Sequence, residues 1–144
     1  MKMISRHLYV VVAGLVFAGT LAVSAQAQPS GKNGQHIAAL NDARSLIIRT
    51  IGAEENSVVM VTTEKAVTVE RINSNMNGSS HGGRDNEAIV IGPIVSQAIA
   101  DKPEFKSVVA IRVQYVHRTS SKDRIVDTIE FRRDAGGNFQ FHQT

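Results

Sequence analysis

The sequence predicts an α+β fold, a two-layer sandwich in which two helices cover one face of an antiparallel sheet of about four to five strands. Two segments carry apolar residues at helical spacing, and the last third of the chain alternates apolar and polar residues between turn-forming stretches. The expected element order is α-β-β-α-β-β-β. Each helix then has one apolar stripe and the sheet has one apolar face, so packing them together buries both.

Residues 1–27 have the composition of a cleavable secretory signal peptide. Two basic residues and no acid precede the uncharged apolar segment 8–23. Small residues at Ala25 and Ala27 follow it, so we expect cleavage just before Gln28. The alternative, an uncleaved anchor, is disfavoured because this apolar segment is shorter than the roughly 20 residues that span a bilayer. We therefore expect an exported protein, periplasmic or extracellular, without a membrane span after cleavage.

Charge and cysteine content exclude several function classes. The chain has 16 basic and 13 acidic residues, and two of the basic ones belong to the expected signal peptide. The nearly neutral remainder, with charges of alternating sign, is unlike the clustered basic face of a nucleic-acid-binding protein. There is no cysteine, so disulfides, thiol catalysis and iron–sulfur clusters are excluded. We expect a flexible leader at residues 28–35 and a single domain, held by its apolar core, at 36–144.

The first half of the expected domain begins with a helix and continues with extended chain. Apolar residues recur at helical spacing over 37–51, and Gly52 is suited to ending that helix. Residues 57–72 are rich in valine and threonine, with a polar break at 63–65. This pattern predicts two short strands joined by a turn, and a single long strand is the alternative.

The second helix is predicted from the apolar spacing over 87–100, with Asp85 as its expected cap. Gly92 and Pro93 interrupt this pattern. Proline inside a helix removes a hydrogen bond and clashes with the preceding turn. Either the helix is kinked there, or Pro93 lies in its first turn and residues 87–91 are extended.

The last third of the chain predicts a three-stranded antiparallel meander, with turns near 119–123 and 134–138. Matching the faces of the strands gives one apolar row and one polar row: Ile111, Phe131 and Phe141, and Arg112, Glu130 and His142. Asp127 interrupts the apolar face. Because an unpaired buried carboxylate is costly, we expect it at the sheet edge or paired with Lys122 or Arg124.

The most suggestive stretch for ligand binding is the Gly- and Ser-rich loop 73–84. A Gly-rich loop before a helix can present backbone N–H groups to an anion, and Arg84 adds a positive charge. The candidate ligand-binding residues are therefore Ser79, Ser80, His81 and Arg84. The loop matches neither the phosphate-binding Walker pattern nor the dinucleotide fingerprint, and a flexible surface loop is the alternative interpretation.

No catalytic residue, metal ligand or cofactor is predicted. The histidines after residue 27 show none of the spacings HxH, HxxxH or HExxH. The row of Arg112, Glu130 and His142 fits a solvated ladder of side chains better than an acid–base site. We therefore expect a small exported, non-catalytic interaction module that binds a protein, such as another envelope protein, or another envelope component, and whose exposed strand meander can accept an added strand. The alternative is a small-ligand or anion-binding protein that uses loop 73–84. The sequence predicts no oligomeric state.

Overall fold

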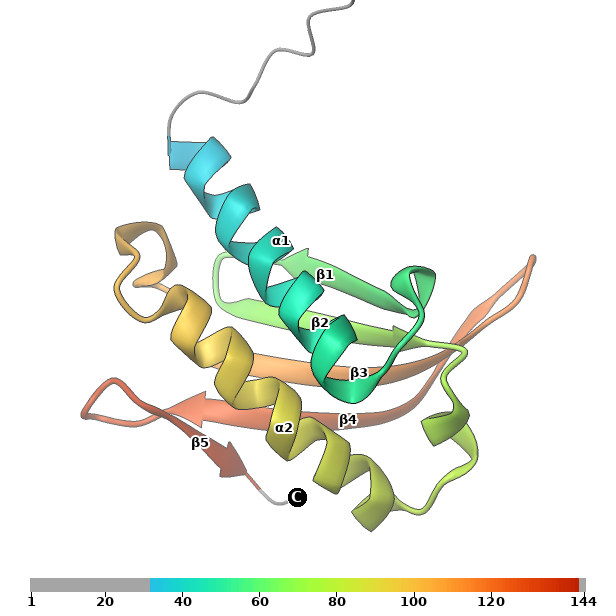
Figure 1. Ribbon diagram of the computed structural model, residues 1–144. Coiled ribbons are helices and arrows are strands. Elements are labelled where there is room, and N and C mark those ends of the chain that lie inside the picture. Colours follow the sequence, from blue (N-terminus) through green and yellow to red (C-terminus); the bar gives the residue numbers. More distant parts are fainter. Residues whose placement is uncertain (1–31, 143–144) are drawn as a thin grey trace, which may run out of the picture.

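The computed structural model describes residues 32–142, with side chains from residue 38 onward, and confirms the predicted element order (Figure 1). The helices and strands are α1 (Lys32–Ile51), β1 (Val58–Thr62), β2 (Ala66–Ile72), α2 (His81–Ile99), β3 (Ala110–Arg118), β4 (Asp123–Arg133) and β5 (Phe139–His142). Three short 3-10 helices lie between them: η1 (Glu55–Ser57), η2 (Asn75–Gly78) and η3 (Pro103–Phe105).

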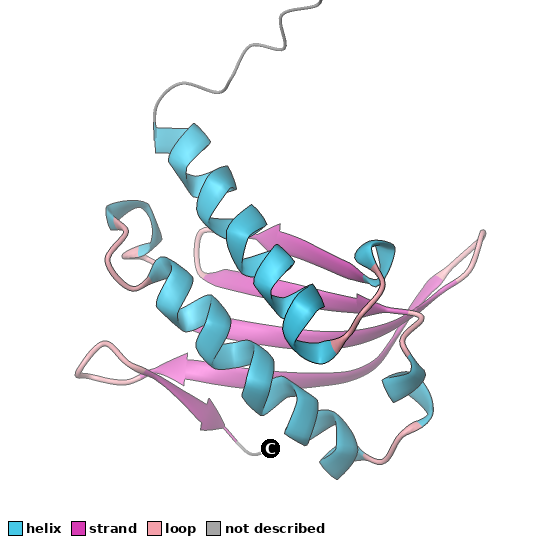
Figure 2. Ribbon diagram, viewed as in Figure 1, coloured by secondary structure: helices cyan, strands magenta, loops and turns pink. Residues whose placement is uncertain are grey.

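The five strands form one sheet in the order β1-β2-β3-β4-β5, with both helices on one face (Figure 2). The pairs β1–β2, β3–β4 and β4–β5 are antiparallel, but β2 and β3 run parallel. The expectation of a wholly antiparallel sheet is therefore wrong at this pair. Helix α2 lies between β2 and β3 in the sequence and carries the chain back along the sheet, so both strands start from the same end.

Helix α1 begins at Lys32, five residues before the expected start at Ile37, and takes in half of the stretch expected as a leader. Residues 32–35 contain no proline, so nothing in them prevents the helix from extending backward. The end is as predicted: Gly52 has a φ of 64°. The Ala53 N–H donates to the Ile48 carbonyl at 3.0 Å, which is a Schellman end.

The predicted hairpin and meander are confirmed. Strands β1 and β2 are separate, and the Thr63 N–H donates to the Ala66 carbonyl at 2.9 Å across their turn. In the meander the register follows the predicted apolar and polar rows: Ile111 pairs with Phe131, Phe131 with Phe141, Arg112 with Glu130 and Glu130 with His142.

Helix α2 starts earlier than predicted and is continuous. Its cap is Ser80 rather than Asp85, because the Ser80 hydroxyl accepts a hydrogen bond from the Gly83 N–H at 3.2 Å. Residues 87–91 are helical, and the helix runs through Pro93. The extended alternative for this stretch is therefore wrong.

Gly92 lets the backbone of α2 approach the sheet closely. A Cβ atom at this position would lie 2.5 Å from Cζ of the Phe131 ring, well inside van der Waals contact. Phe131 is itself buried and stacks edge-to-face on Phe141, with ring centroids 5.6 Å apart. The glycine that weakens the helical pattern in the sequence is thus required by the packing of α2 on β4.

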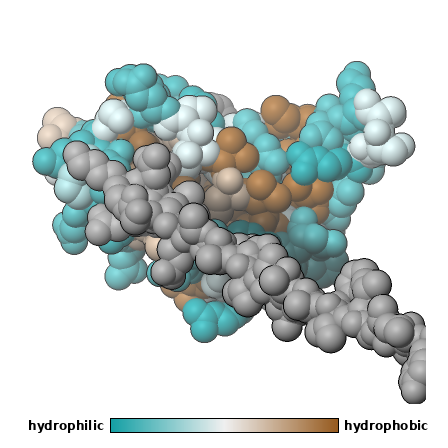
Figure 3. Space-filling model, turned by 90° about the horizontal axis from the view of Figure 1, so that it is seen from above, coloured by the Kyte–Doolittle hydropathy of each residue, from teal (hydrophilic) through white to brown (hydrophobic). Residues whose placement is uncertain are grey.

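The core lies between the helices and the sheet. It contains buried apolar residues from both helices and from strands β1 to β4, among them Ile47, Val69, Ile91, Ile111 and Phe131. In the described part of the chain no helix has the length and apolarity needed to cross a membrane. Some large apolar side chains stay exposed, including Leu46 and Val61. Figure 3 shows hydrophobic residues gathered on the side of the molecule viewed from above.

Candidate functional site

A cavity of about 590 Å³ lies where β2 ends, between the two helices. Its walls come from the C-terminal turn of α1 and the residues after it (51–54), from η1 (56–57), from the end of β2 and the following loop (71–76), and from Glu87 of α2. We call it the Arg71 pocket. Three parts of the chain that are distant in sequence, 51–57, 71–76 and Glu87, meet there, so the fold itself creates this concave surface.

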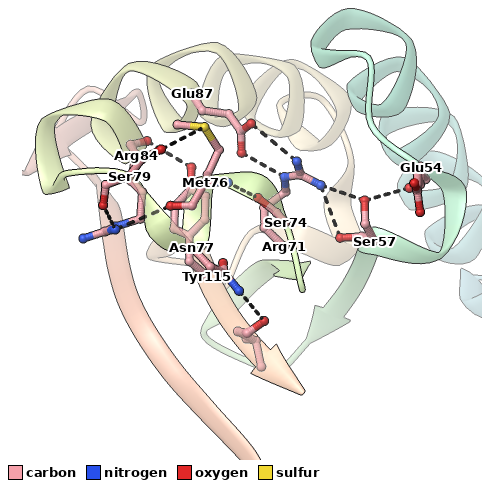
Figure 4. A network of polar contacts seen from close by, with 11 residues as sticks. Glu54, Ser57, Arg71, Ser74, Met76, Asn77, Ser79, Arg84, Glu87 and Tyr115 are labelled. Carbon is pink, nitrogen blue, oxygen red and sulfur yellow. Dashed lines mark hydrogen bonds and ion pairs between the residues drawn. The ribbon is translucent and has the colours of Figure 1, made fainter. Parts of the chain in front are cut away.

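A buried ion pair lies in the wall of the Arg71 pocket (Figure 4). Arg71 Nε donates to Glu87 Oε1 at 2.8 Å, and a second guanidinium nitrogen lies 3.4 Å from Oε2. Another nitrogen of Arg71 donates to the Ser57 hydroxyl at 2.9 Å and to its carbonyl at 3.3 Å. The side chains of Arg71 and Glu87 are only 4% and 12% exposed. Desolvating two charges is costly, so this dense set of hydrogen bonds is what makes their burial tolerable.

Tyr115 lies beside this ion pair and is a hydrogen-bond donor. Its hydroxyl donates to the Arg84 carbonyl at 3.0 Å. Burial raises the pKa of the Tyr115 phenol, and the nearby Glu87 carboxylate raises it further. The phenol therefore stays protonated at physiological pH and cannot serve as a base there.

The charges around the Arg71 pocket favour a cation over an anion. Its lining contains two carboxylates, Glu54 and Glu87, and one guanidinium, that of Arg71. The C-terminal end of α1, at Ile51 and Gly52, adds the partial negative charge of helix carbonyls. Asparagine and serine side chains in the lining supply neutral hydrogen-bonding groups.

The loop after β2 is fastened to β3. Asn73, which has a φ of 48°, donates from its amide to the Arg118 carbonyl at 3.0 Å and accepts from the Arg118 N–H at 2.8 Å. The Asn77 amide donates to the Val116 carbonyl at 3.0 Å. Side chains of the loop 73–84 thus hold one wall of the Arg71 pocket in place. This part of the loop is bonded to β3, unlike the flexible surface loop of the alternative interpretation.

The four residues predicted from the sequence as ligand contacts lie together at the start of α2, outside the lining of the Arg71 pocket. Ser80 is occupied as the helix cap. Arg84 is only 11% exposed, donates to Asp127 at 2.7 Å and also donates to the Ser79 carbonyl. Its charge is balanced within the fold, which leaves less attraction for an anion than the sequence-based hypothesis assumed.

Asp127 is paired as expected, but with different residues. Its carboxylate contacts Arg84 and, at 2.7 Å, His81 Nδ1, instead of Lys122 or Arg124. Asp127 projects toward α2, whose first turn brings His81 and Arg84 over the strand. No local pattern reveals these partners, because they lie more than 40 residues away in the sequence.

His81 titrates under the influence of these acids. The hydrogen bond and the charge of Asp127, with a smaller contribution from Asp85 at 3.6 Å, raise the pKa of His81. Partial burial by itself would raise the pKa of Asp127. The hydrogen bonds from His81 and Arg84 nevertheless lower it. The pair therefore fastens the first turn of α2 to β4 when the imidazole is protonated.

The open face of the sheet carries the predicted ladder. Arg112 donates to Glu130 at 2.7 Å, and Arg132 donates to the same carboxylate at 2.6 Å. Hydrogen bonds from these two arginines lower the pKa of Glu130. Within residues 32–142 no group of three histidine, aspartate or glutamate side chains is placed to hold a metal ion.

Sequence reasoning missed Arg71 and Glu87, although a local signal exists for each. Arg71 follows Val67 and Val69 at alternate positions of β2, so it lies on the face that packs against the helices. Glu87 precedes Ile91 by four residues and therefore shares the buried stripe of α2. A charge at an apolar position in both elements indicates a buried ion pair.

Comparison with protein-family models, with curated proteins and with solved structures finds no match to this chain.

Proposed function

We propose that this chain is an exported, non-catalytic binding module that holds a small polar ligand in the Arg71 pocket. The observation that supports this most directly is a cavity of about 590 Å³ with the buried Arg71–Glu87 pair in its wall. Its volume falls within the range of about 300 to 1,000 Å³ that is usual for small-molecule sites. Most of the lining residues are polar, so the pocket can hold a polar ligand through several hydrogen bonds.

A binding role fits these groups better than catalysis does. Arg71 and Glu87 neutralise each other, and Tyr115 keeps its proton. A general base must be able to accept a proton near the working pH, and a nucleophile needs such a base beside it. The described side chains of the pocket supply donors and acceptors for recognition instead.

The ligand class follows from the charges of the lining. Two carboxylates, one guanidinium and the C-terminal end of α1 leave an excess of negative charge. We therefore propose a ligand that carries a protonated amine, with its other polar groups bound by the asparagine and serine side chains of the lining. Anion binding at Ser79, Ser80, His81 and Arg84 is the alternative, and it would require Arg84 to release Asp127.

Export is proposed from the composition of residues 1–27, which lie outside the described part of the chain. Native mass spectrometry of the protein recovered from the exported fraction of its own host tests this directly. We expect a mass that begins at Gln28, with an added small mass if the ligand survives purification. A chain that retains residues 1–27 would contradict the export proposal.

The binding proposal is tested by NMR titration with putrescine and arginine, with acetate and phosphate as anionic comparators. We expect the amines to shift backbone signals of residues 52–57 and 73–76. Asn56→Trp places a large side chain in the lining and should weaken amine binding at least tenfold. Asn41→Trp, on the exposed side of α1, is the matched control and should bind like the wild type.

Two outcomes would count against the pocket. Shifts that appear only with the anions, centred on residues 79–84, would support the alternative site. Equal amine binding by Asn56→Trp and the wild type would show that the Arg71 pocket is not where the amine binds.

A further inference from the structure

Strand β1 forms one edge of the sheet and lacks the features that normally protect an edge. Its five residues, Val58–Thr62, include no charge, proline or glycine, and they pair with β2 in unbroken register. Val61 is 40% exposed. Natural edge strands are usually guarded by charges, prolines, bulges or short length, because unpaired backbone groups recruit other strands.

The other edge is guarded. Strand β5 has only four residues, and its outward-facing positions Gln140 and His142 are polar and exposed. The Arg133 guanidinium lies 4.7 Å from the centre of the Phe139 ring and covers the start of this strand. Because β5 pairs only with Glu130–Arg133, residues 123–129 of β4 also belong to this edge, and Asp123, Arg124 and Asp127 guard them with charge. The edge without such protection is therefore that of β1.

The backbone of β1 shows which groups face outward. The Thr63 N–H bonds to Ala66 across the turn, so alternation directs the groups of residues 63, 61 and 59 toward β2. Residues 58, 60 and 62 then present their N–H and C=O groups to the outside. The bond from Arg44 Nε to the Val58 carbonyl, at 2.7 Å, agrees with this assignment and covers only the start of the strand.

We infer that β1 pairs antiparallel with β1 of a second copy, so that two five-stranded sheets become one continuous sheet. A two-fold axis through Met60 sets Met60 opposite its own copy and Val58 opposite Thr62. These are the residues whose backbone groups face outward, so both strands offer matching donors and acceptors, although the Val58 carbonyl must then accept from Thr62 in addition to Arg44 Nε. Such a self-complementary contact is what a symmetric dimer requires.

The side chains are complementary in the same register. Val59 of one copy lies opposite Val61 of the other, on the face away from buried Val58, so the pairing covers the exposed valine on both copies. Cross-strand pairs of β-branched residues stabilise sheets. Figure 3 shows hydrophobic residues exposed on the side where α1 and β1 lie.

The oligomeric state of the full exported protein tests the inference. Analytical ultracentrifugation should show twice the mass of one chain at micromolar concentration. Val61→Lys should weaken the association at least tenfold, and Thr62→Pro should do the same because it removes an outward N–H without touching the ladder to β2. Ile125→Lys is the matched control: this residue is also exposed, but it lies on β4, three strands away from β1 across the sheet.

The register is tested by disulfide trapping, which the absence of native cysteine makes simple. Val59 and Val61 face each other as a non-hydrogen-bonded pair, in which Cα atoms lie about 4.5 Å apart. A mixture of Val59→Cys and Val61→Cys proteins should therefore cross-link faster than either protein alone.

Three results would overturn the inference: a monomer at high micromolar concentration, a dimer that Val61→Lys leaves intact, or faster cross-linking of a single variant with itself. A complex with a different exported protein that Val61→Lys dissolves would show that β1 binds that protein and not a second copy. Amine binding in the Arg71 pocket does not depend on any of these outcomes.

Discussion

Replacing Glu87 by glutamine keeps the size of the side chain and removes the charge that faces Arg71. The two side chains are 12% and 4% exposed, and their closest nitrogen and oxygen are 2.8 Å apart. An exposed pair of this geometry would contribute at most about 1 kcal/mol, whereas removing one partner of a buried pair costs about 3–5 kcal/mol. Because Glu87 also lines the Arg71 pocket, water can reach its side chain, and we expect a loss near 3 kcal/mol, the lower end of that range.

Urea denaturation at pH 7 measures this loss as a change in the free energy of unfolding. A loss of about 3 kcal/mol is a large part of the roughly 5–15 kcal/mol that stabilises a typical domain, and it should lower Tm by about 10 °C or more. The matched control is the double variant Arg71→Met with Glu87→Met, which buries no charge. Apolar replacement of a whole buried pair is often neutral or stabilising, so the double variant should be more stable than Glu87→Gln.

The reasoning depends on the burial of Arg71 as an uncompensated charge. A loss below about 1 kcal/mol for Glu87→Gln would mean that the guanidinium reaches water and that the pair behaves like a surface ion pair. A double variant as unstable as the single one would show that packing or the hydrogen bonds to Ser57, and not the unpaired charge, account for the loss.

Three further predictions concern the elements around the site. Gly92→Ala should gain up to about 1 kcal/mol of stability in helix propensity but lose about 1–3 kcal/mol through overpacking, because its Cβ would lie 2.5 Å from the Phe131 ring. We therefore expect a lower Tm, which Phe131→Leu should partly restore. A higher Tm in the single variant would contradict the close approach of α2 to β4. The pKa of His81 is raised in the fold and that of Asp127 is lowered, so the stabilisation by this pair should be fully present between about pH 3.9 and 6.5, the usual pKa values of the two groups. It should fade as the pH rises through the higher folded pKa of His81 and as it falls through the lower folded pKa of Asp127. The difference in unfolding free energy between the wild type and His81→Gln should therefore shrink between pH 6 and 9, and a constant difference would refute the assignment. Asn73→Ala loses two hydrogen bonds and places alanine at a positive φ, so urea denaturation should show a loss of about 2 kcal/mol, with Asn73→Gly losing less because glycine tolerates that φ.

The meander shows how far residue patterns alone can lead. The alternation in three neighbouring segments was sufficient to predict the register that pairs Ile111 with Phe131 and Phe131 with Phe141, because a shift by one residue would expose the aromatic rings. The same approach failed for the pairing of β2 with β3. Alternation does not record strand direction, which depends on the path that α2 takes across the sheet.

The candidate site was harder to predict for a related reason. The loop 73–84 stood out because glycine and serine are conspicuous, yet its arginine is used inside the fold by Asp127. Arg71 and Glu87 were overlooked because each is one charged residue within an apolar pattern. They form a pair only because both side chains point into the space between β2 and α2 once the helix has packed on the sheet.

By itself, the sequence determined the element order, the helix end at Gly52, the hairpin, the meander and its register, since these follow from hydrophobic periodicity and turn chemistry within short stretches of chain. Only the tertiary structure decided that β2 and β3 run parallel, that Glu87 meets Arg71, and that Asp127 meets His81 and Arg84. Those contacts depend on how α2 lies over the sheet. Side chains that are far apart in the sequence come within contact distance only after the helices have packed on the sheet, so the sequence order alone does not show which of them will pair.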